Sequence, residues 1–328
     1  MHQMQHSNSV PETFQILALD GGGVKAIYTA HLLARLETDL GLRLTDHFDL
    51  VAGTSAGGII ALALGAGLSP AEIVDHYEKL ASTVFPPSRR RWYRWPARLR
   101  RATYKQEPLR AALEEILGER FLGDSVKRLL IPSWDALVGS VHIFKTPHHP
   151  RLTRDHRIRM VDVAMATSAA PTFLPAALVD GHRLLDGGLW ANNPSALAVA
   201  EALSTLNVPL ERIKVLNIGT TTPLTDHPRV LDRAGYLRWA TRAVDLSLTA
   251  AGRGTQGLAT HLLGADHYQR FDAVVPRGRY RLDRSDAGDL AGFAAASSRG
   301  LSPIFASKFA NHCATPYEPC ISGSEIEV

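Results

Sequence analysis

The sequence predicts an α/β protein with three layers, α/β/α, built around a mostly parallel central sheet. Short apolar runs alternate with segments whose apolar residues recur at helical spacing, and two glycine-rich turns each join a run to such a segment. The 328 residues are enough to bury a large core. A hydrophobic content of 45% with 21% charged residues excludes disordered and fibrous proteins.

The first four elements follow one another closely along the chain. Residues Phe14–Leu19 run apolar into a glycine turn and are expected to form a buried strand. Helical spacing follows in Ala26–Leu40, and Gly41 is a suitable helix stop. A second strand is expected at Phe48–Ala52, followed by a helix of small residues at Gly57–Gly67.

The rest of the chain continues this alternation. Ser69, Pro70 and Glu72 supply an N-cap, a proline at the first helical position and an early acid, so a helix is expected to begin there. Further strands are expected at Leu129–Ile131, Val141–Lys145 and Val215–Ile218, and further helices at Ser195–Thr205 and about Val230–Thr249. Because there is no internal repeat or long linker, we expect one domain over residues 14–321, with flexible tails at 1–13 and 322–328.

Composition narrows the class of protein. A net charge of +4 is too weakly basic to indicate a nucleic-acid partner, so no DNA or RNA is expected. Cys313 and Cys320 are the only cysteines, which argues against a disulfide framework or a zinc cluster. Residues 1–13 lack the pattern of a secretory signal, and no apolar run approaches the roughly 18 residues of a spanning helix. We therefore expect a cytoplasmic protein.

The second glycine-rich turn, Gly53-Thr54-Ser55-Ala56-Gly57, has the form of a nucleophile elbow. Ser55 would project its hydroxyl from a strained turn, and Gly53 and Gly57 would keep neighbouring backbone clear of side chains. The following helix would point its N-terminal dipole at developing negative charge. Small residues also line ordinary strand–helix turns, which is the alternative interpretation.

The first glycine-rich turn, Gly21-Gly22-Gly23, offers backbone amides that could hold an oxyanion, with Lys25 nearby. A simple tight turn is one alternative. A dinucleotide fingerprint is another, because Gly21-x-Gly23-x-x-Ala26 fits its pattern. That fingerprint requires an acid at the end of the second strand, whereas Asp49 lies at its start, and it leaves the serine turn unexplained. The two turns together favour a serine acyl hydrolase.

A serine nucleophile needs a base, and the best candidate is Asp186. Residues Asp180-Gly181 are a strong two-residue hairpin signal, and the returning strand would carry Asp186 to its end. Gly187 and Gly188 would then let the chain leave sharply and keep the carboxylate accessible. The alternative is that Asp186 only bonds its own turn.

These motifs, taken in order, resemble the patatin-like phospholipase family. The resemblance spans about Phe14–Thr222 and rests on six motifs: Asp20-Gly21-Gly22-Gly23, Gly53-Thr54-Ser55-Ala56-Gly57, Ala166-Thr167-Ser168-Ala169-Ala170-Pro171, Asp186-Gly187-Gly188, Asn192-Asn193-Pro194 and Asn217-Ile218-Gly219-Thr220. Two departures are Ala26, where the family usually has a further glycine, and Lys25, where arginine is common. Neither removes an amide donor.

The resemblance implies a phospholipase of the A type that cleaves fatty-acyl esters with a Ser–Asp dyad and with no histidine, metal or other cofactor. Carried over by motif, Ser55 is the nucleophile, Asp186 the general base, and Gly21, Gly22 and Gly23 the oxyanion hole. Gly53, Gly57, Gly187 and Gly188 support these motifs. Burial must raise the pKa of the aspartate for this chemistry to work near neutrality.

An ordinary α/β-hydrolase with a Ser–Asp–His triad is the nearest chemical rival. Only two strands precede Ser55, whereas that fold places its elbow after several. The histidines available to such a triad stand in no recognisable setting: His182, His227, His261, His267 and His312.

The most unusual segment is Pro86–Lys105, in which arginines alternate with aromatic residues and no acid occurs. Such a mixture suits anionic lipid head groups, and equally a nucleotide or a protein partner. A solvated basic loop is the alternative. The contact candidates are Arg89, Arg90, Arg91, Trp92, Arg94 and Trp95.

Some bacterial patatin-like proteins of about this length also resemble the chain and act as antiphage effectors that a cyclic nucleotide switches on. That resemblance implies a cyclic-dinucleotide activator, a phospholipid substrate, peripheral action at the inner membrane and assembly into a homo-oligomer. A constitutive lipid hydrolase and a non-catalytic lipid-binding module of the same fold stay open. The basic residues beyond Thr222 that could contact phosphates are Arg229, Arg233, Arg238, Arg242, Arg253 and Lys308.

Overall fold

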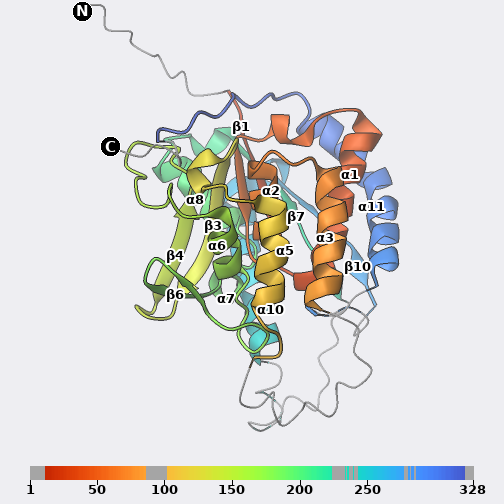
Figure 1. Cartoon of the computed structure of the whole chain (residues 1–328). Helices are drawn as coiled ribbons and strands as arrows, with labels where there is room; N and C mark the ends of the chain where they lie inside the picture. The colour runs from red at the N-terminus through yellow and green to blue at the C-terminus, as the bar shows by residue number, and fades with distance from the viewer. Residues whose placement is uncertain are drawn as a thin grey trace, which may run out of the picture.

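The computed structural model describes residues 12–85, 102–223, 233, 235, 239, 243–276, 280, 282, 283 and 286–321. An eight-stranded sheet runs through its centre in the order β5-β6-β3-β2-β1-β7-β9, and β4 pairs with the other edge of β3 (Figure 1). The strands are β1 (Phe14–Leu19), β2 (Leu50–Gly53), β3 (Arg128–Asp135), β4 (Ser140–Lys145), β5 (Ala177–Val179), β6 (His182–Asp186), β7 (Ile213–Ile218) and β9 (Tyr268–Phe271). A separate parallel pair joins β8 (Thr222–Pro223) to β10 (Val274–Val275).

Helices cover both faces of this sheet (Figure 1). On one face lie α1 (Ala26–Leu40), α2 (Ala56–Gly65), α3 (Pro70–Val84), α5 (Glu107–Leu117), α6 (Met160–Thr167) and α11 (Ala287–Lys308). On the other lie α8 (Ser195–Ser204) and α10 (Ala243–His267). The short α7 (Gly188–Ala191) follows β6 directly. The predicted three-layer α/β/α class is therefore confirmed.

Strand β1 explains why the central strands read as continuous apolar runs. All six of its residues are buried. Leu17 and Leu19 belong to the core under α1 and α2, whereas Phe14, Ile16 and Ala18 belong to the core under α8. A strand buried on both faces has no polar face, so its sequence does not alternate.

Several predicted elements are confirmed closely. The first strand and the first helix have the predicted bounds, and Ser69 caps α3 in a capping box with Glu72. The hairpin turn is also confirmed, with φ of 47° at Asp180 and 78° at Gly181. These two positive values are those of the hairpin turn that Asp-Gly favours.

One expectation needs correction. The helix expected at about Val230–Thr249 instead continues as α10 to His267, with a kink at Gly264, where φ is 73°. The sheet is mostly parallel, as expected, and its antiparallel pairs are β3 with β4, β3 with β6 and β5 with β6. The predicted tails lie outside the described residues, apart from Glu12 and Thr13.

Within the part of the chain that the structure describes, the helices are either too short or too polar to cross a bilayer.

Candidate active site

Ser55 occupies a sharp turn between β2 and α2. Its φ of 54° and ψ of −121° lie in a region that side-chain-bearing residues rarely adopt. Two hydrogen bonds fix the turn. The Ser55 N–H donates to Thr167 Oγ1 at 3.0 Å, and Thr167 Oγ1 donates to the Pro132 carbonyl at 2.7 Å. This strained strand-to-helix turn has the geometry expected of a nucleophile elbow.

The flanking glycines are required by close backbone approach. A Cβ at Gly57 would collide with the carbonyl oxygens of Leu19 and Asp20, at the end of the neighbouring strand β1. A Cβ at Gly53 would collide with the carbonyl of Gly57 itself. The elbow can therefore form only with glycine at both positions.

Asp186 stands at the end of β6, where its carboxylate meets the serine. Ser55 Oγ donates to Asp186 Oδ2 at 2.7 Å, and the Gly188 N–H donates to Asp186 Oδ1 at 2.7 Å. The Asp186 N–H donates in turn to the Ala169 carbonyl at 3.1 Å, which fixes the strand end. The structure thus brings together the two residues that the sequence assigned as nucleophile and base.

Burial changes the acidity of this carboxyl group. Asp186 is 3% exposed, and burial raises its pKa to about 6, although the hydrogen bonds from the Gly188 amide and Ser55 act in the opposite direction. The shift is in the direction that a carboxylate base needs near neutral pH.

The glycine loop after β1 offers fewer free amides than the sequence suggested. The Gly21 N–H donates to the Asn192 carbonyl at 2.9 Å, so this amide is already bonded. The amides of Gly22 and Gly23 have no hydrogen-bond partner among the described residues, and both glycines line the cavity at Ser55. Gly23 has a φ of 59°, and a Cβ there would collide with the Leu282 carbonyl. The two free donors are therefore those of Gly22 and Gly23.

An apolar cavity opens in front of the serine and the aspartate. It is lined by Gly22, Gly23, Ser55, Asp186 and a wall of aliphatic and aromatic side chains from α2, α3, α5 and the residues around them: Ile59, Leu80, Phe85, Leu109, Phe173, Leu174, Leu248 and Leu282. Tyr77 also lines it and donates from its hydroxyl to the Gly23 carbonyl at 3.1 Å. A hydrocarbon chain suits this wall.

A second, polar cavity of about 480 Å³ lies on the other side of the glycine loop. Lys25 and Arg253 line it, and it shares Asn192 and Leu248 with the apolar cavity. Thr221, on its wall, has a φ of 94° and a buried hydroxyl without a hydrogen-bond partner among the described residues.

Two positioning residues were not assigned from the sequence. Thr167 was quoted within a motif but received no role, and it now holds the Ser55 amide. Asn192 accepts from Gly21 through its carbonyl and contacts both cavities. Both residues lie within the motifs quoted from the sequence, which was the only indication of a role. Because they act through backbone hydrogen bonds, the spacing of residues along the chain does not reveal that role.

Of the histidines considered for a triad, His227 lies outside the described residues, and the others do not hydrogen-bond to Asp186. His312 contacts Asp49 at 2.7 Å, and His182 contacts Asp135 at 2.6 Å. Among the described residues, the Asp186 carboxylate accepts hydrogen bonds from the Ser55 hydroxyl and from the Gly188 backbone amide. The predicted contact residues Arg89, Arg90, Arg91, Trp92, Arg94 and Trp95 lie outside the described residues.

The fold and this arrangement of side chains define the class: an α/β ester hydrolase. The chain belongs to the patatin-like phospholipase family, whose model matches residues 17–199, more than half of its length. A dinucleotide-binding fold is thereby excluded as the meaning of the first glycine turn.

Three bacterial relatives share the printed name "cGAMP-activated phospholipase". The Pseudomonas aeruginosa protein is 37% identical over 271 residues, covering 80% of each chain. The Vibrio cholerae protein is 38% identical and covers 63% of this chain and 64% of its own, and the Escherichia coli protein is 31% identical and covers 93% and 94%. Among solved structures, VipD of Legionella pneumophila has a TM-score of 0.49 at 12% identity, covering 91% of this chain and 67% of its own.

Proposed function

We propose that this enzyme cleaves fatty-acyl esters of membrane phospholipids with Ser55 and Asp186, and that a cyclic dinucleotide activates it. The observation that carries the chemical part is the 2.7 Å hydrogen bond from Ser55 Oγ to a buried carboxylate at the mouth of an apolar cavity. The names of the three bacterial relatives support the regulatory part.

The geometry of the site supports the following reaction. Ser55 Oγ attacks the ester carbonyl carbon while its proton passes to Asp186 Oδ2. The Gly22 and Gly23 amides stabilise the oxyanion, and the proton then leaves with the alcohol or lysolipid as the ester bond breaks. Water, deprotonated by the same carboxylate, attacks the acyl-serine ester and releases the fatty acid.

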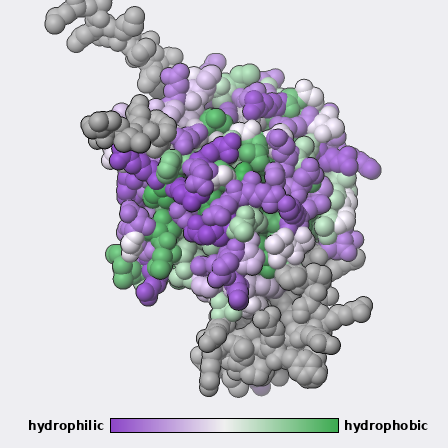
Figure 2. Space-filling view, viewed as in Figure 1, coloured by the Kyte–Doolittle hydropathy of each residue, from purple (hydrophilic) through white to green (hydrophobic). Residues whose placement is uncertain are grey.

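A membrane surface is the proposed place of action. Strand β3 runs parallel to β2, so the turn after β3 lies at the same end of the sheet as Ser55. That turn carries Leu137 and Val138, which are 66% and 67% exposed. Figure 2 shows hydrophobic residues at the lower left of the molecule, where Figure 1 places β4 and β6. We propose that these side chains contact the inner membrane from the cytoplasm.

The polar cavity is the proposed place of the activator. Lys25 and Arg253 offer positive charge to two phosphodiester groups, and the volume of about 480 Å³ suits a ligand larger than a mononucleotide. Because Asn192 both lines this cavity and bonds the Gly21 amide, a ligand there would act on the loop that carries the Gly22 and Gly23 donors. We propose that the active form is a homo-oligomer.

The test is fatty-acid release from anionic liposomes with and without a panel of cyclic dinucleotides. We expect release only when one of the nucleotides is present, and none from Ser55→Ala. Equal release with and without every nucleotide would establish the constitutive hydrolase instead. Wild-type release that Ser55→Ala retains would contradict the dyad.

A further inference from the structure

Three side chains of types that can bind a metal ion lie close together on β3, β4 and β6. Asp135, His142 and His182 each offer one ligand atom, and these atoms all lie within 4.8 Å of one another. His182 Nδ1 lies 2.6 Å from Asp135 Oδ2, and the two imidazole rings lie 5.2 Å apart between centroids. This is the only such cluster in the described part of the chain.

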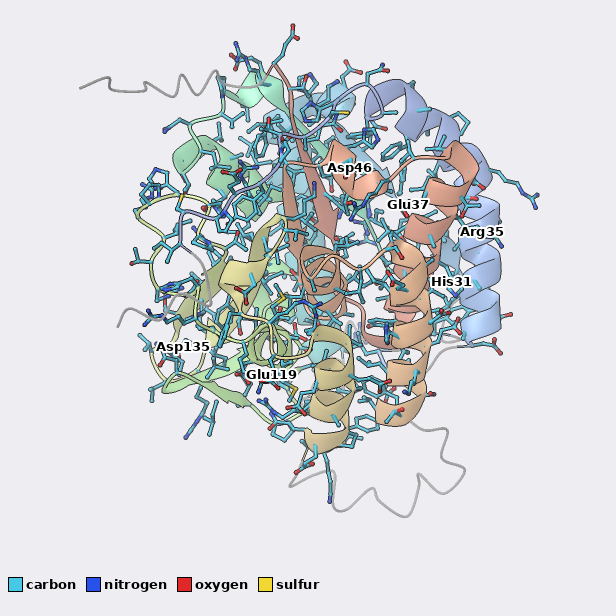
Figure 3. The ribbon with its side chains drawn as sticks, turned by 45° about the horizontal axis from the view of Figure 1, so that its top comes forward. His31, Arg35, Glu37, Asp46, Glu119 and Asp135 are labelled. Carbon is cyan, nitrogen blue, oxygen red and sulfur yellow. The ribbon has the colours of Figure 1, made fainter. Side chains whose placement is uncertain are left out.

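The strand register explains why the fold brings these residues together. Strand β3 lies between β4 and β6, with Ser133 opposite His142 on β4 and Asp135 opposite Leu184 on β6. His182 is two residues from Leu184, so all three donors point to one face of the sheet, diagonally across adjacent strands. Figure 3 shows Asp135 at the outer end of the sheet, on the side opposite His31 of α1.

One donor lacks the partner that its burial requires. His142 is 6% exposed, and its Nε2 atom is buried without a hydrogen-bond partner among the described residues. A buried polar atom of this kind normally has a protein, water or ion partner. Arg154, which lies near His142, is paired with Asp155, so its positive charge is largely balanced.

We propose that Asp135, His142 and His182 bind a divalent transition metal, with Zn²⁺ as the best fit. Two imidazoles and a carboxylate are a frequent zinc donor set, with water completing a tetrahedral site. Ligand atoms about 2.0–2.2 Å from the ion lie closer together than 4.8 Å, so the metal would draw the three side chains inward. The His182 side chain is 38% exposed, which leaves an entry path from solvent.

Such a metal would cross-link β3, β4 and β6 and would take no part in the acyl-transfer steps. Strand β6 ends at Asp186, four residues after His182, so the metal would stiffen the strand that positions the base. The sequence argued against a zinc cluster from its two cysteines, and this donor set contains no cysteine. The donors come from three different strands, so no single motif indicated them.

The test is calorimetric titration of the tag-free, chelator-treated protein with Zn²⁺, together with thermal unfolding. We expect one tight site, a rise in Tm with Zn²⁺, and loss of both in His142→Gln and in His182→Asn. The exposed His261→Ala on α10 is the matched control and should bind as the wild type does. Co²⁺ in place of Zn²⁺ should give the absorption bands of a tetrahedral site.

Two further measurements distinguish loss of metal binding from loss of folding or of catalysis. His182→Asn changes a partly exposed side chain, so its metal-free Tm checks the fold if His142→Gln unfolds. Labelling of Ser55 by a fluorophosphonate should proceed in the metal-free wild type. Absence of Zn²⁺ binding by the wild type, or unchanged binding in the well-folded His182→Asn variant, would overturn the proposal.

Discussion

Ser55 Oγ donates a 2.7 Å hydrogen bond to Asp186 Oδ2, although the two residues are 131 positions apart in the chain. Each side chain is held by its own backbone contacts: the Ser55 amide by Thr167 Oγ1, and the Asp186 amide by the Ala169 carbonyl. Since Thr167 and Ala169 belong to one short segment, a single stretch of chain sets the position of both partners.

Removing either member of the pair should abolish hydrolysis. We expect Ser55→Ala and Asp186→Asn each to lower kcat/KM for a soluble ester by about 10³-fold or more, because both act in one step. Steady-state assays with the activator present measure this. Circular dichroism should show that both variants are folded, and substantial turnover in either one would remove it from the proposed mechanism.

The fall in rate on the acid side of the pH–rate profile should reflect the pKa of the general base, Asp186. Because burial raises the pKa of Asp186 to about 6, kcat/KM should fall as the pH drops through this value and the carboxylate becomes protonated. A profile that stays flat down to pH values near the ordinary 3.8 of an aspartate would contradict the assignment.

The same shift makes a prediction about stability. A folded pKa above the unfolded value of 3.8 means that ionisation of Asp186 destabilises the fold, and the loss develops as the pH rises from about 4 to 6. Asp186→Asn should therefore raise the unfolding free energy above pH 6 by about 3 kcal/mol at most, and by little at pH below 4. Urea unfolding at the two pH values measures the difference; equal effects at both would count against a buried charge.

Thr167 should act as a positioning residue. Thr167→Val keeps the shape but removes the hydroxyl that accepts from the Ser55 amide, so we expect kcat to fall about 10–100-fold with little change in KM. The exposed Thr38→Val on α1 is the matched control and should leave both constants unchanged. A rise in KM alone would place Thr167 in substrate binding instead.

Arg253 should matter for activation and not for chemistry. Arg253→Ala removes a cation from the polar cavity, so the half-maximal concentration of the activating cyclic dinucleotide should rise about tenfold or more. Arg35→Ala, an exposed arginine on α1 seen in Figure 3, is the control. If both variants respond like the wild type, the activator binds elsewhere, whereas failure of the wild type to respond at all would refute nucleotide activation itself.

For the segment Pro86–Lys105, the prediction from the sequence is contact with anionic lipid head groups. Replacing Arg89, Arg90, Arg91 and Arg94 by glutamine should weaken binding to anionic vesicles much more than it lowers hydrolysis of a soluble ester. Vesicle co-sedimentation and the ester assay give the two numbers. Equal losses in both would indicate a structural role for these arginines.

Much of this site could be predicted because its reactive residues lie within short local sequence motifs. Gly57 is required because backbone at the end of β1 lies within contact distance, Gly53 because the Gly57 carbonyl does, and the Asp180-Gly181 turn returns β6 toward the serine. Contacts between residues far apart in the chain could not be predicted in this way. The bond from Gly21 to Asn192 and the support of Ser55 by Thr167 depend on how distant elements pack. The end of α10 was also missed, because its apolar spacing gave no clear stop signal before the kink at Gly264.

The most direct test of the central claim is active-site labelling with a fluorophosphonate lipid analogue in the presence of the activator, followed by peptide mass spectrometry. The account predicts one adduct, on Ser55, formed much more slowly in Asp186→Asn and absent from Ser55→Ala. An adduct on another residue, or equal labelling of Asp186→Asn and the wild type, would contradict it.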